Sequence, residues 1–319
     1  MSSQFEGHLN RLRRGVSTVE VVHAPHDRWP LRNRTFPSCS HINISVLDSS
    51  FDPPTLAHLA LANIPLSKAF RCTHTHQTSD CCAFHAKLLL LSVRNADKSL
   101  KPGDATYEQR MDMMIRLSED VKPDISAKSD VDERLSVEDS NTAVAIIDEP
   151  TFVGKARLLL EYFREKLSSF SDSDGIFHDP QNGTESRTLE PQLTFIVGMD
   201  TLERLCAPRY YSSEEDMNRR LTQFLSPDGD NCRVICARRI TPGLPVSEDE
   251  RERSVIERTK TFISSNRIAI VDIGDGLRSF SSSETRATVH SGSPLWKTMV
   301  TPKVAEYIAQ HHLYSQASS

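Results

Sequence analysis

The stretch that decides the fold is residues 41–63, which read HINISVLDSSFDPPTLAHLALAN. Apolar and polar residues alternate from Ile42 to Val46, a pattern that predicts a short buried strand. Residues 48–54 cannot continue a strand, and apolar residues then recur at helical spacing, with Pro54 in the expected first turn of the helix. The sequence therefore predicts a strand, a tight loop and a helix.

The start of this predicted helix is a candidate phosphate site. It offers unpaired backbone N–H groups and the positive end of the helix dipole. Thr55 and His58 are three residues apart and share one face of the first turn. An imidazole beside a bound phosphate indicates chemistry on that phosphate. The alternative is an ordinary strand–helix unit with a histidine on its surface.

Length and composition limit the class of protein. The chain has 319 residues, a net charge of −5 and 38% hydrophobic residues. This charge gives no support for a nucleic-acid partner, which would normally require a basic face. No apolar run approaches the length of a membrane span, and the longest is Leu88–Leu91. Seven cysteines at irregular spacing are typical of reduced thiols, so we expect a cytoplasmic protein, with the nucleus as a second location.

The first 35 residues are rich in arginine, so a transit peptide is an alternative interpretation of the N-terminus. Glu6, Glu20 and Asp27 argue against it, because transit peptides are poor in acidic residues. We expect residues 1–40 to form an N-terminal extension, with a short helix over Phe5–Arg14, packed on the domain that follows.

Strand and helix patterns alternate along the rest of the chain. This alternation predicts an α/β fold with one doubly wound, open parallel sheet of Rossmann-like type, forming a single domain over residues 41–315. Loop insertions are expected at about 71–86, 168–190 and 241–252, where the composition is polar. The expected strands are 42–47, 88–93, 143–147, 193–197, 233–237 and 268–273; the expected helices are 55–62, 107–119, 152–167, 201–205, 253–264, 281–290 and 302–311.

The segment 72–85 holds six candidate metal ligands within 14 positions, three cysteines and three histidines. Their spacing, C-x-H-x-H-x4-C-C-x2-H, matches no established zinc frame. We therefore interpret the segment as a surface insertion and assign no metal ligand in the chain. A zinc site is the alternative.

A second motif lies at residues 280–286, FSSSETR, after the last predicted strand. Ser281 and Glu284 have the spacing of a capping box, which predicts a helix start. Arg286 then lies in the first turns, where a cation opposes the helix dipole and requires an anion. A nucleotide phosphate would supply one; the alternative is a surface arginine after a capping serine.

Other polar residues follow the predicted strands. Because the carboxyl ends of parallel strands meet at one edge of a sheet, we expect them to lie near the 48–58 loop, where such sheets bind ligands. They are Lys98, Gly198, Asp200 and Arg238.

Both motifs together resemble the nicotinamide-mononucleotide adenylyltransferase family, most closely its fungal branch, within the nucleotidylyltransferase superfamily. The family signature G-S-F-[ND]-P-x-T-x-x-H is SSFDPPTLAH at 49–58, and its I-S-S-T-x-x-R is FSSSETR at 280–286. The family's G-x-D has a counterpart at 198–200 and its C-terminal tail one at 300–314, so the resemblance spans about 42–314. Here serine replaces the first glycine of the signature and also the threonine of the late one.

The resemblance implies transfer of the adenylyl group of ATP, with Mg²⁺, to nicotinamide mononucleotide, giving NAD and pyrophosphate. His58 would contact the transferring phosphates and Arg286 the β- and γ-phosphates. The acceptor would bind Lys98 and Arg238 through its phosphate and would stack on Phe152, which stands where the family has tryptophan. The implied ATP site also includes Ser49, Ser50, Phe51, Thr55, Gly198, Asp200, Ser281, Ser282 and Ser283.

Two alternatives stay open from the sequence. One is a related nucleotidylyltransferase, or a slow ATPase, acting on another acceptor. The other is a nucleotide-binding quality-control protein without catalysis. The choice between nicotinamide and nicotinate mononucleotide and the presence of a homo-oligomer also stay open.

Overall fold

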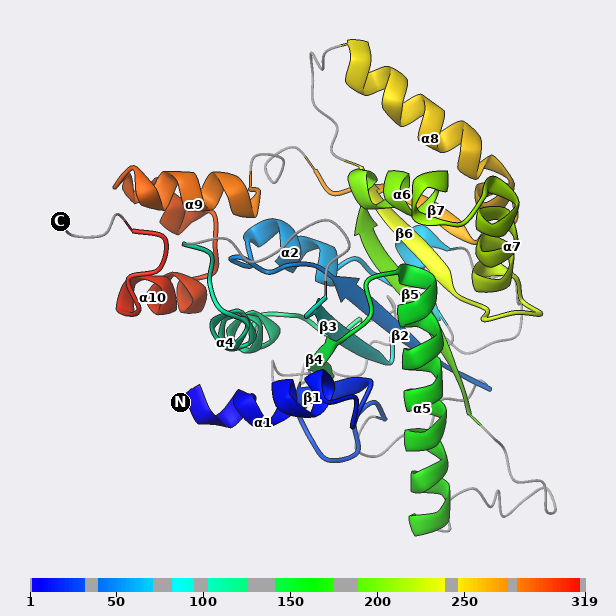
Figure 1. Cartoon of the computed structure of the whole chain (residues 1–319), viewed down its shortest axis with the longest axis horizontal. Helices are drawn as coiled ribbons and strands as arrows, with labels where there is room; N and C mark the ends of the chain where they lie inside the picture. Colours follow the sequence, from blue (N-terminus) through cyan, green and yellow to red (C-terminus); the bar gives the residue numbers. More distant parts are fainter. Residues whose placement is uncertain are drawn as a thin grey trace, which may run out of the picture.

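The computed structural model describes residues 2–31, 40–70, 82–94, 103–124, 141–174, 189–238, 246–274 and 280–315 (Figure 1). Seven strands in these ranges form one sheet in the order β1-β4-β3-β2-β5-β6-β7. The strands are β1 (Val19–His23), β2 (His41–Asp48), β3 (Ala86–Ser92), β4 (Thr142–Ile147), β5 (Glu190–Gly198), β6 (Arg233–Arg238) and β7 (Ile268–Asp272).

The sheet is parallel from β2 to β7. From β2 the chain adds β3 and β4 on one side, and then returns to place β5, β6 and β7 on the other. The order therefore reverses between β2 and β5, and ligands of doubly wound sheets bind outside the carboxyl ends of the strands at such a point. The predicted fold class is confirmed, and the 48–58 loop lies at this reversal.

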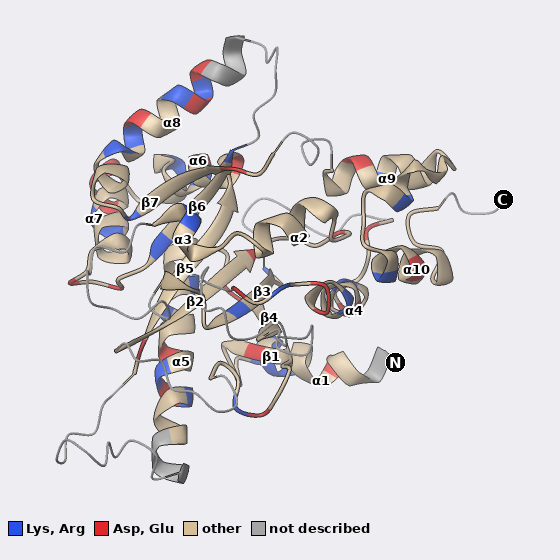
Figure 2. Cartoon of the chain, turned by 180° about the vertical axis from the view of Figure 1, so that it is seen from behind, with Lys and Arg blue, Asp and Glu red and all other residues tan. Residues whose placement is uncertain are grey.

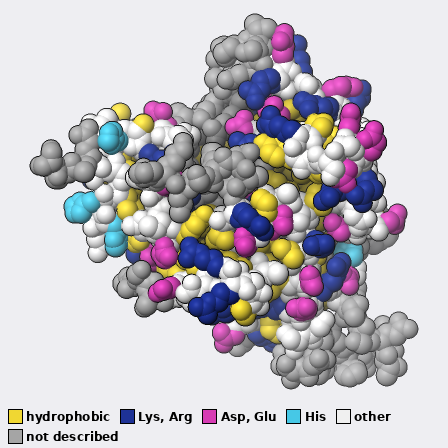
Figure 3. Space-filling view, in the orientation of Figure 1, with side chains coloured by type: hydrophobic (Ala, Val, Ile, Leu, Met, Phe, Trp, Pro, Cys, Tyr) yellow, Lys and Arg dark blue, Asp and Glu magenta, His cyan; other side chains and the backbone are white. Residues whose placement is uncertain are grey.

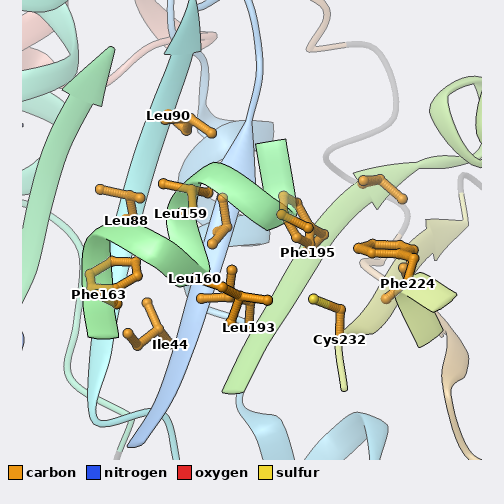
Figure 4. Packing of buried hydrophobic residues seen from close by; sticks show 14 of the residues in the cluster. Ile44, Leu88, Leu90, Leu159, Leu160, Phe163, Leu193, Phe195, Phe224 and Cys232 are labelled. Atoms are coloured by element: carbon orange, nitrogen blue, oxygen red, sulfur yellow. The ribbon is translucent and has the colours of Figure 1, made fainter. Parts of the chain in front are cut away.

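Helices cover both faces of the sheet (Figure 1). The two faces are read directly from the strands, because successive side chains point to opposite sides. Val46 and Leu88 belong to one apolar cluster, whereas Leu47 and Leu89 belong to the other. Figure 4 shows the first cluster, with α5 side chains packed over β2, β3 and β5. The helices are α1 (Ser2–Arg13), α2 (Leu56–Ala62), α3 (Leu66–Ala69), α4 (Tyr107–Ser118), α5 (Phe152–Asp174), α6 (Met199–Leu205), α7 (Glu214–Leu225), α8 (Val246–Ser264), α9 (Ser282–His290) and α10 (Pro302–Gln310).

The first apolar cluster contains side chains of α5, α6, α7 and α8, and the second contains side chains of α1, α2, α3 and α4. A third cluster joins α4 to α10 and to Trp296 in the short 3-10 helix Pro294–Thr298. This third cluster holds the C-terminal segment against the domain. Charged side chains of both signs are interspersed over the face in Figure 3.

Several elements were not predicted, among them strand β1, helix α7 and the single-turn helix α3. Strand β1 pairs antiparallel with β4 at the sheet edge, so part of the N-terminal extension is a strand of the domain's own sheet. Helix α7 follows Ser213, whose hydroxyl accepts a hydrogen bond from the Asp216 N–H. The spacing of Ser213 and Asp216 was an available capping signal.

Several predicted boundaries are wrong. Helix α2 begins at Leu56 with Thr55 as its N-cap, so Pro54 precedes the helix and is not in its first turn. Helix α5 continues to Asp174, into the predicted 168–190 insertion, and α8 begins at Val246, inside the predicted 241–252 insertion. Strand β3 begins at Ala86, the last position of the predicted 71–86 insertion. Long apolar faces on α5 and packing of α8 on β7 extend these helices beyond what local composition indicates.

Most of the cysteine- and histidine-rich stretch, residues 71–81, lies outside the described ranges. His85 within it is buried, and its Nδ1 accepts a hydrogen bond of 2.9 Å from the Asn43 N–H. Cys206, Cys232 and Cys236 are buried free thiols, as expected, whereas Cys82 is disulfide-bonded and does not fit the expectation of reduced thiols. No described helix combines the length and apolar content that crossing a membrane requires.

Candidate functional site

The loop after β2 folds back over the end of the sheet. The Ser49 N–H donates to the Leu90 carbonyl at 3.2 Å and so continues the pairing of β2 with β3 by one residue. Phe51 is fully buried and has a φ of 46°, in the left-handed region that residues other than glycine seldom adopt. Its ring lies 5.1 Å from the imidazole of His58, centroid to centroid. The loop is therefore anchored in the core and fixes one face of that histidine.

His58 is oriented through both ring nitrogens. The Thr55 N–H donates to His58 Nδ1 at 3.0 Å, and a backbone amide can only donate, so Nδ1 is an acceptor. The neutral imidazole then carries its proton on Nε2. The hydroxyl oxygen of Ser49 lies 2.9 Å from Nε2 and accepts that proton in a hydrogen bond. His58 is thus arranged as a neutral donor at the end of β2.

The second motif begins α9 as predicted. Ser281 is the N-cap, and its hydroxyl accepts from the Glu284 N–H at 3.0 Å. Ser282 is half-buried and Ser283 is exposed, so the first turn of α9 faces both the protein and solvent.

Three hydrogen bonds join the two motifs. The Thr55 hydroxyl donates to the Phe280 carbonyl at 2.9 Å, across 225 residues of sequence. The Ser282 hydroxyl donates to the Pro53 carbonyl at 2.8 Å. The Arg286 guanidinium donates to the Asp52 carbonyl. The predicted proximity of the two motifs is therefore confirmed.

Asp52 is the centre of this junction, and its side chain is almost fully buried. One carboxylate oxygen accepts from the Arg110 guanidinium at 3.0 Å, and Arg286 lies 3.5 Å from the same oxygen. The other accepts from the Tyr314 hydroxyl at 2.7 Å and from the Ala105 N–H at 3.2 Å. The anion that Arg286 requires is supplied here by the protein itself.

The electrostatics of the junction keep Tyr314 as a donor. Burial raises the pKa of Tyr314 far above its ordinary value, and the neighbouring Asp52 carboxylate raises it further. The phenol therefore stays protonated and holds the C-terminal segment on the loop. Arg110 also donates to the Ala105 and Ser50 carbonyls, at 2.9 and 3.3 Å, which places Ser50 in the same network.

The G-x-D motif lies at the neighbouring strand. Gly198 ends β5 and is the N-cap of α6, and Asp200 is exposed in the first turn of that helix. Strand β5 pairs with β2, so both residues lie at the same edge of the sheet as the loop. Within the described residues no hydrogen bond or ion pair joins Asp200 to either motif, and its predicted role stays a prediction.

The first turn of α5 forms a second group at this edge. Phe152 packs edge-to-face on Phe195, with ring centroids 5.7 Å apart. The Lys155 ammonium lies 5.0 Å from the Phe152 ring centroid and forms a buried ion pair of 2.5 Å with Asp48, the last residue of β2. Phe152 is half-buried, and its predicted stacking role stays a prediction.

Two further residues, Arg238 and Lys98, are predicted to bind the phosphate of the acceptor nucleotide. Arg238, at the end of β6, forms an ion pair with Glu252 of α8, so its charge is already matched. Lys98 lies outside the described residues.

Sequence reasoning missed the buried groups that support the site. Asp52 is part of the first signature and Tyr314 part of the tail, but nothing in their spacing indicates that they meet. Arg110 interrupts the apolar face of α4 next to Met111, and a charged residue on a buried face was the available signal.

Comparison with known proteins agrees with the motifs. No family model matches the chain. A Schizosaccharomyces pombe (strain 972 / ATCC 24843) protein named "Putative nicotinamide mononucleotide adenylyltransferase" is 25% identical over 218 residues, which cover 68% of this chain. The match spans 61% of that relative's length. This chain resembles nicotinamide-mononucleotide adenylyltransferases.

Among solved structures, the chain is similar to a Plasmodium falciparum nicotinic acid mononucleotide adenylyltransferase complexed with APC. The identity is 14% and the TM-score 0.41, over 86% of this chain and 98% of the other. The resemblance predicted from the motifs is confirmed by the curated relative.

Proposed function

We propose that the chain transfers the adenylyl group of ATP to nicotinamide mononucleotide, giving NAD and pyrophosphate. The observation that carries this proposal is the junction of the two motifs, in which three hydrogen bonds hold the start of α9 on the 52–55 loop. The junction brings an imidazole donor and a guanidinium to one loop at the carboxyl edge of the sheet. Such an arrangement suits a polyphosphate, which needs several fixed donors.

In the proposed reaction an oxygen of the acceptor's phosphate attacks the α-phosphorus of ATP. A new P–O bond forms as the bond from the α-phosphorus to the bridging oxygen breaks, and pyrophosphate leaves with that electron pair. No covalent enzyme intermediate is required. The chain contributes position and charge: the His58 Nε2–H donates towards the reacting phosphates, and its hydrogen bond from Thr55 keeps that proton on Nε2.

Helix α9 would hold the leaving end of the triphosphate. The Ser281 hydroxyl caps the Glu284 N–H, and the N–H groups of Ser282 and Ser283 in the same first turn favour an anion. Arg286 retains exposed surface on its side chain, 29%, so it can contact a phosphate while it stays bonded to Asp52. Asp52 then acts as the group that orients the guanidinium.

Mg²⁺, bound with ATP, would neutralise phosphate charge and so lower repulsion of the attacking phosphate. The described residues contain no group of three or more His, Cys, Asp and Glu side chains that could hold a metal ion. Asp48 and Asp52 are both occupied by cations of the chain. The site therefore fits Mg²⁺ coordinated mainly by phosphate oxygens and water, as Mg²⁺ in nucleotide sites commonly is.

The test is NAD formation by purified protein from ATP, Mg²⁺ and nicotinamide mononucleotide, with nicotinate mononucleotide as a parallel acceptor. We expect NAD to form, and His58→Ala to lower kcat/KM about 10²- to 10³-fold, the usual loss for one preorganised donor. His290→Ala is the matched control, because His290 is exposed at the far end of α9. Full activity in His58→Ala would refute the role given to that histidine.

A second candidate, nucleotide binding with slow or no turnover, is favoured by one specific observation. Both groups that would meet phosphate already have protein partners, His58 Nε2 with Ser49 and Arg286 with Asp52. Ser49 stands where the resembled signature has glycine. For this candidate, wild-type protein binds ATP and forms NAD slowly or not at all, and Ser49→Gly forms NAD at least ten times faster than the wild type because it releases the Nε2–H. NAD formation by the wild type at rates near those of the variant selects the first candidate.

A further inference from the structure

A second group of charges lies at the opposite, amino-terminal edge of the sheet. Arg233 is the first residue of β6, and Arg267 comes directly before β7. Val234 is paired with Ile268, and the Val234 N–H donates to the Arg267 carbonyl at 2.9 Å. The two arginines are therefore neighbours on adjacent parallel strands.

Both side chains project from the face that α2 and α3 cover. Val234 and Ile268 belong to the apolar cluster on the α5 face, so Arg233 and Arg267 alternate to the other side. The Arg233 guanidinium carbon lies 5.1 Å from the ring centroid of Phe70, which follows α3 and is buried. Basic segments lie beside α3 in Figure 2. The two cations thus share a partly buried site next to an aromatic wall.

The same strand positions form a polar row across the sheet. Arg233 is paired with Thr194, Thr194's neighbour in β2 is Ser45, and Ser45 is paired with Lys87. Lys87 is 4% exposed, and its ammonium donates to the carbonyls of Ala62 and Lys122, each at 2.8 Å. At the β3 end of the row, the buried cation therefore has carbonyl partners. The arginines at the β6 and β7 end differ in this respect.

Among the described residues, the two arginines have no such partners. In the part of the chain that the structure describes, neither guanidinium forms an ion pair or a side-chain hydrogen bond, and Arg233 Nε is buried without a partner. Arg267 is only 9% exposed. Burial and, to a lesser extent, the charge of Arg267 together lower the pKa of Arg233 to about 10, and burial also lowers the pKa of Arg267. Two adjacent cations without a counter-ion, Arg267 buried and Arg233 half-buried, are unfavourable, and an anion would remove that penalty.

We propose that Arg233 and Arg267, beside Phe70, bind a phosphate-type oxyanion at the amino-terminal edge of the sheet. Two neighbouring guanidiniums match a dianion better than a single carboxylate, and their planar forks suit bidentate contacts to phosphoryl oxygens. The anion is free phosphate or the phosphoryl group of a small metabolite. This site lies at the other end of β6 from Arg238 and is separate from the nucleotide site.

The test is thermal unfolding and calorimetric titration with inorganic phosphate and, in a second arm, glycerol 3-phosphate, in phosphate-free buffer at constant ionic strength. We expect phosphate to raise the Tm of the wild type, because a ligand that binds only the folded state stabilises it. The shift should be lost in Arg233→Gln and in Arg267→Gln. It should persist in His58→Ala, which separates this site from the nucleotide site whether or not NAD synthesis is found. Arg219→Gln is the matched control, because Arg219 is an exposed residue of α7.

The direction of the change in Tm without phosphate is a further criterion. In phosphate-free buffer Arg233→Gln should unfold at the wild-type temperature or above it, because the substitution removes an unpaired charge. Arg233→Lys keeps the charge but loses the fork and should weaken phosphate binding at least threefold. An equal shift with glycerol 3-phosphate identifies a phosphoryl site, and a shift with free phosphate alone identifies an inorganic phosphate site. No saturable phosphate binding by the wild type, an undiminished shift in Arg233→Gln, or a lower Tm of Arg233→Gln in phosphate-free buffer would overturn the proposal.

Discussion

The two edges of the sheet differ in whether their charged side chains have partners within the described residues. At the carboxyl edge, Asp52 receives two guanidiniums, a phenol and a backbone N–H, so the network is complete without any ligand. At the amino edge, Arg233 and Arg267 lie together with no ion-pair partner in the described ranges. The Asp52 network fixes the shape of a site before any ligand binds, whereas the arginine pair would be stabilised by a bound anion. Buried polar groups of the first kind are therefore expected to control stability, and those of the second kind ligand dependence.

The largest effect is expected for Asp52→Ala. The substitution leaves the buried Arg110 without its carboxylate and frees Tyr314 and Arg286, so we expect a loss of about 3–5 kcal/mol in the free energy of unfolding. Urea unfolding at pH 7 measures it, with Asp228→Ala, at an exposed position, as the matched control. A loss no larger than that of the control would contradict the view that the carboxyl edge is a completed network.

Tyr314→Phe sharpens the same comparison by removing one donor while the ion pair stays. A hydrogen bond to a charged group contributes about 1.5–3 kcal/mol, and three other donors remain on Asp52, so we expect a loss near the lower end of that range. The expected change lies between those of Asp52→Ala and the control Tyr210→Phe, at a half-buried position outside the junction. If Tyr314→Phe were as damaging as Asp52→Ala, the phenol rather than the carboxylate would be the centre of the junction.

Glu20, in the edge strand β1, is a third charged group whose contribution to stability can be measured through its pH dependence. Burial raises the pKa of Glu20, but hydrogen bonds from Arg11, Ser17 and His8 outweigh it and lower the pKa from 4.5 to about 2. Because the folded-state pKa is depressed, the contribution of Glu20 to stability is present above pH 4.5 and is lost as the pH falls towards 2. The stability difference between wild type and Glu20→Gln should shrink over that range in acid unfolding curves. A difference that stays constant with pH would show that these contacts do not depend on the charge of Glu20.

The smallest effect is expected for Arg238→Gln. Arg238 is predicted from the sequence to attract the acceptor phosphate, but it is partly exposed and paired with Glu252. Exposed ion pairs contribute about 0–1 kcal/mol, so we expect little change in Tm and less than a threefold change in the KM for nicotinamide mononucleotide. A tenfold rise in KM at unchanged Tm would mean that Arg238 leaves Glu252 to bind substrate, as the sequence predicts.

Local pattern was sufficient for much of the fold. Continuous or alternating apolar runs located the six parallel strands, because each must be buried against helices on both sides. Ser281 and Glu284 located the start of α9, because a side-chain cap acts within one turn. Strand β1 was not predicted, because a strand of five residues at an antiparallel edge shows too little periodicity to be recognised in the sequence. The full lengths of α5 and α8 were not predicted either, because tertiary packing can extend a helix that its own residues favour only weakly.

The sequence by itself determined the alternation of strands and helices, the two helix starts with their histidine and arginine, and the resemblance to nicotinamide-mononucleotide adenylyltransferases. These features depend on residues within a few positions of one another. The tertiary structure decided which polar groups meet: Asp52 with Arg110, Arg286 and Tyr314, and Arg233 with Arg267. Strand order and register bring these partners together across tens to hundreds of residues, and no local spacing encodes such contacts.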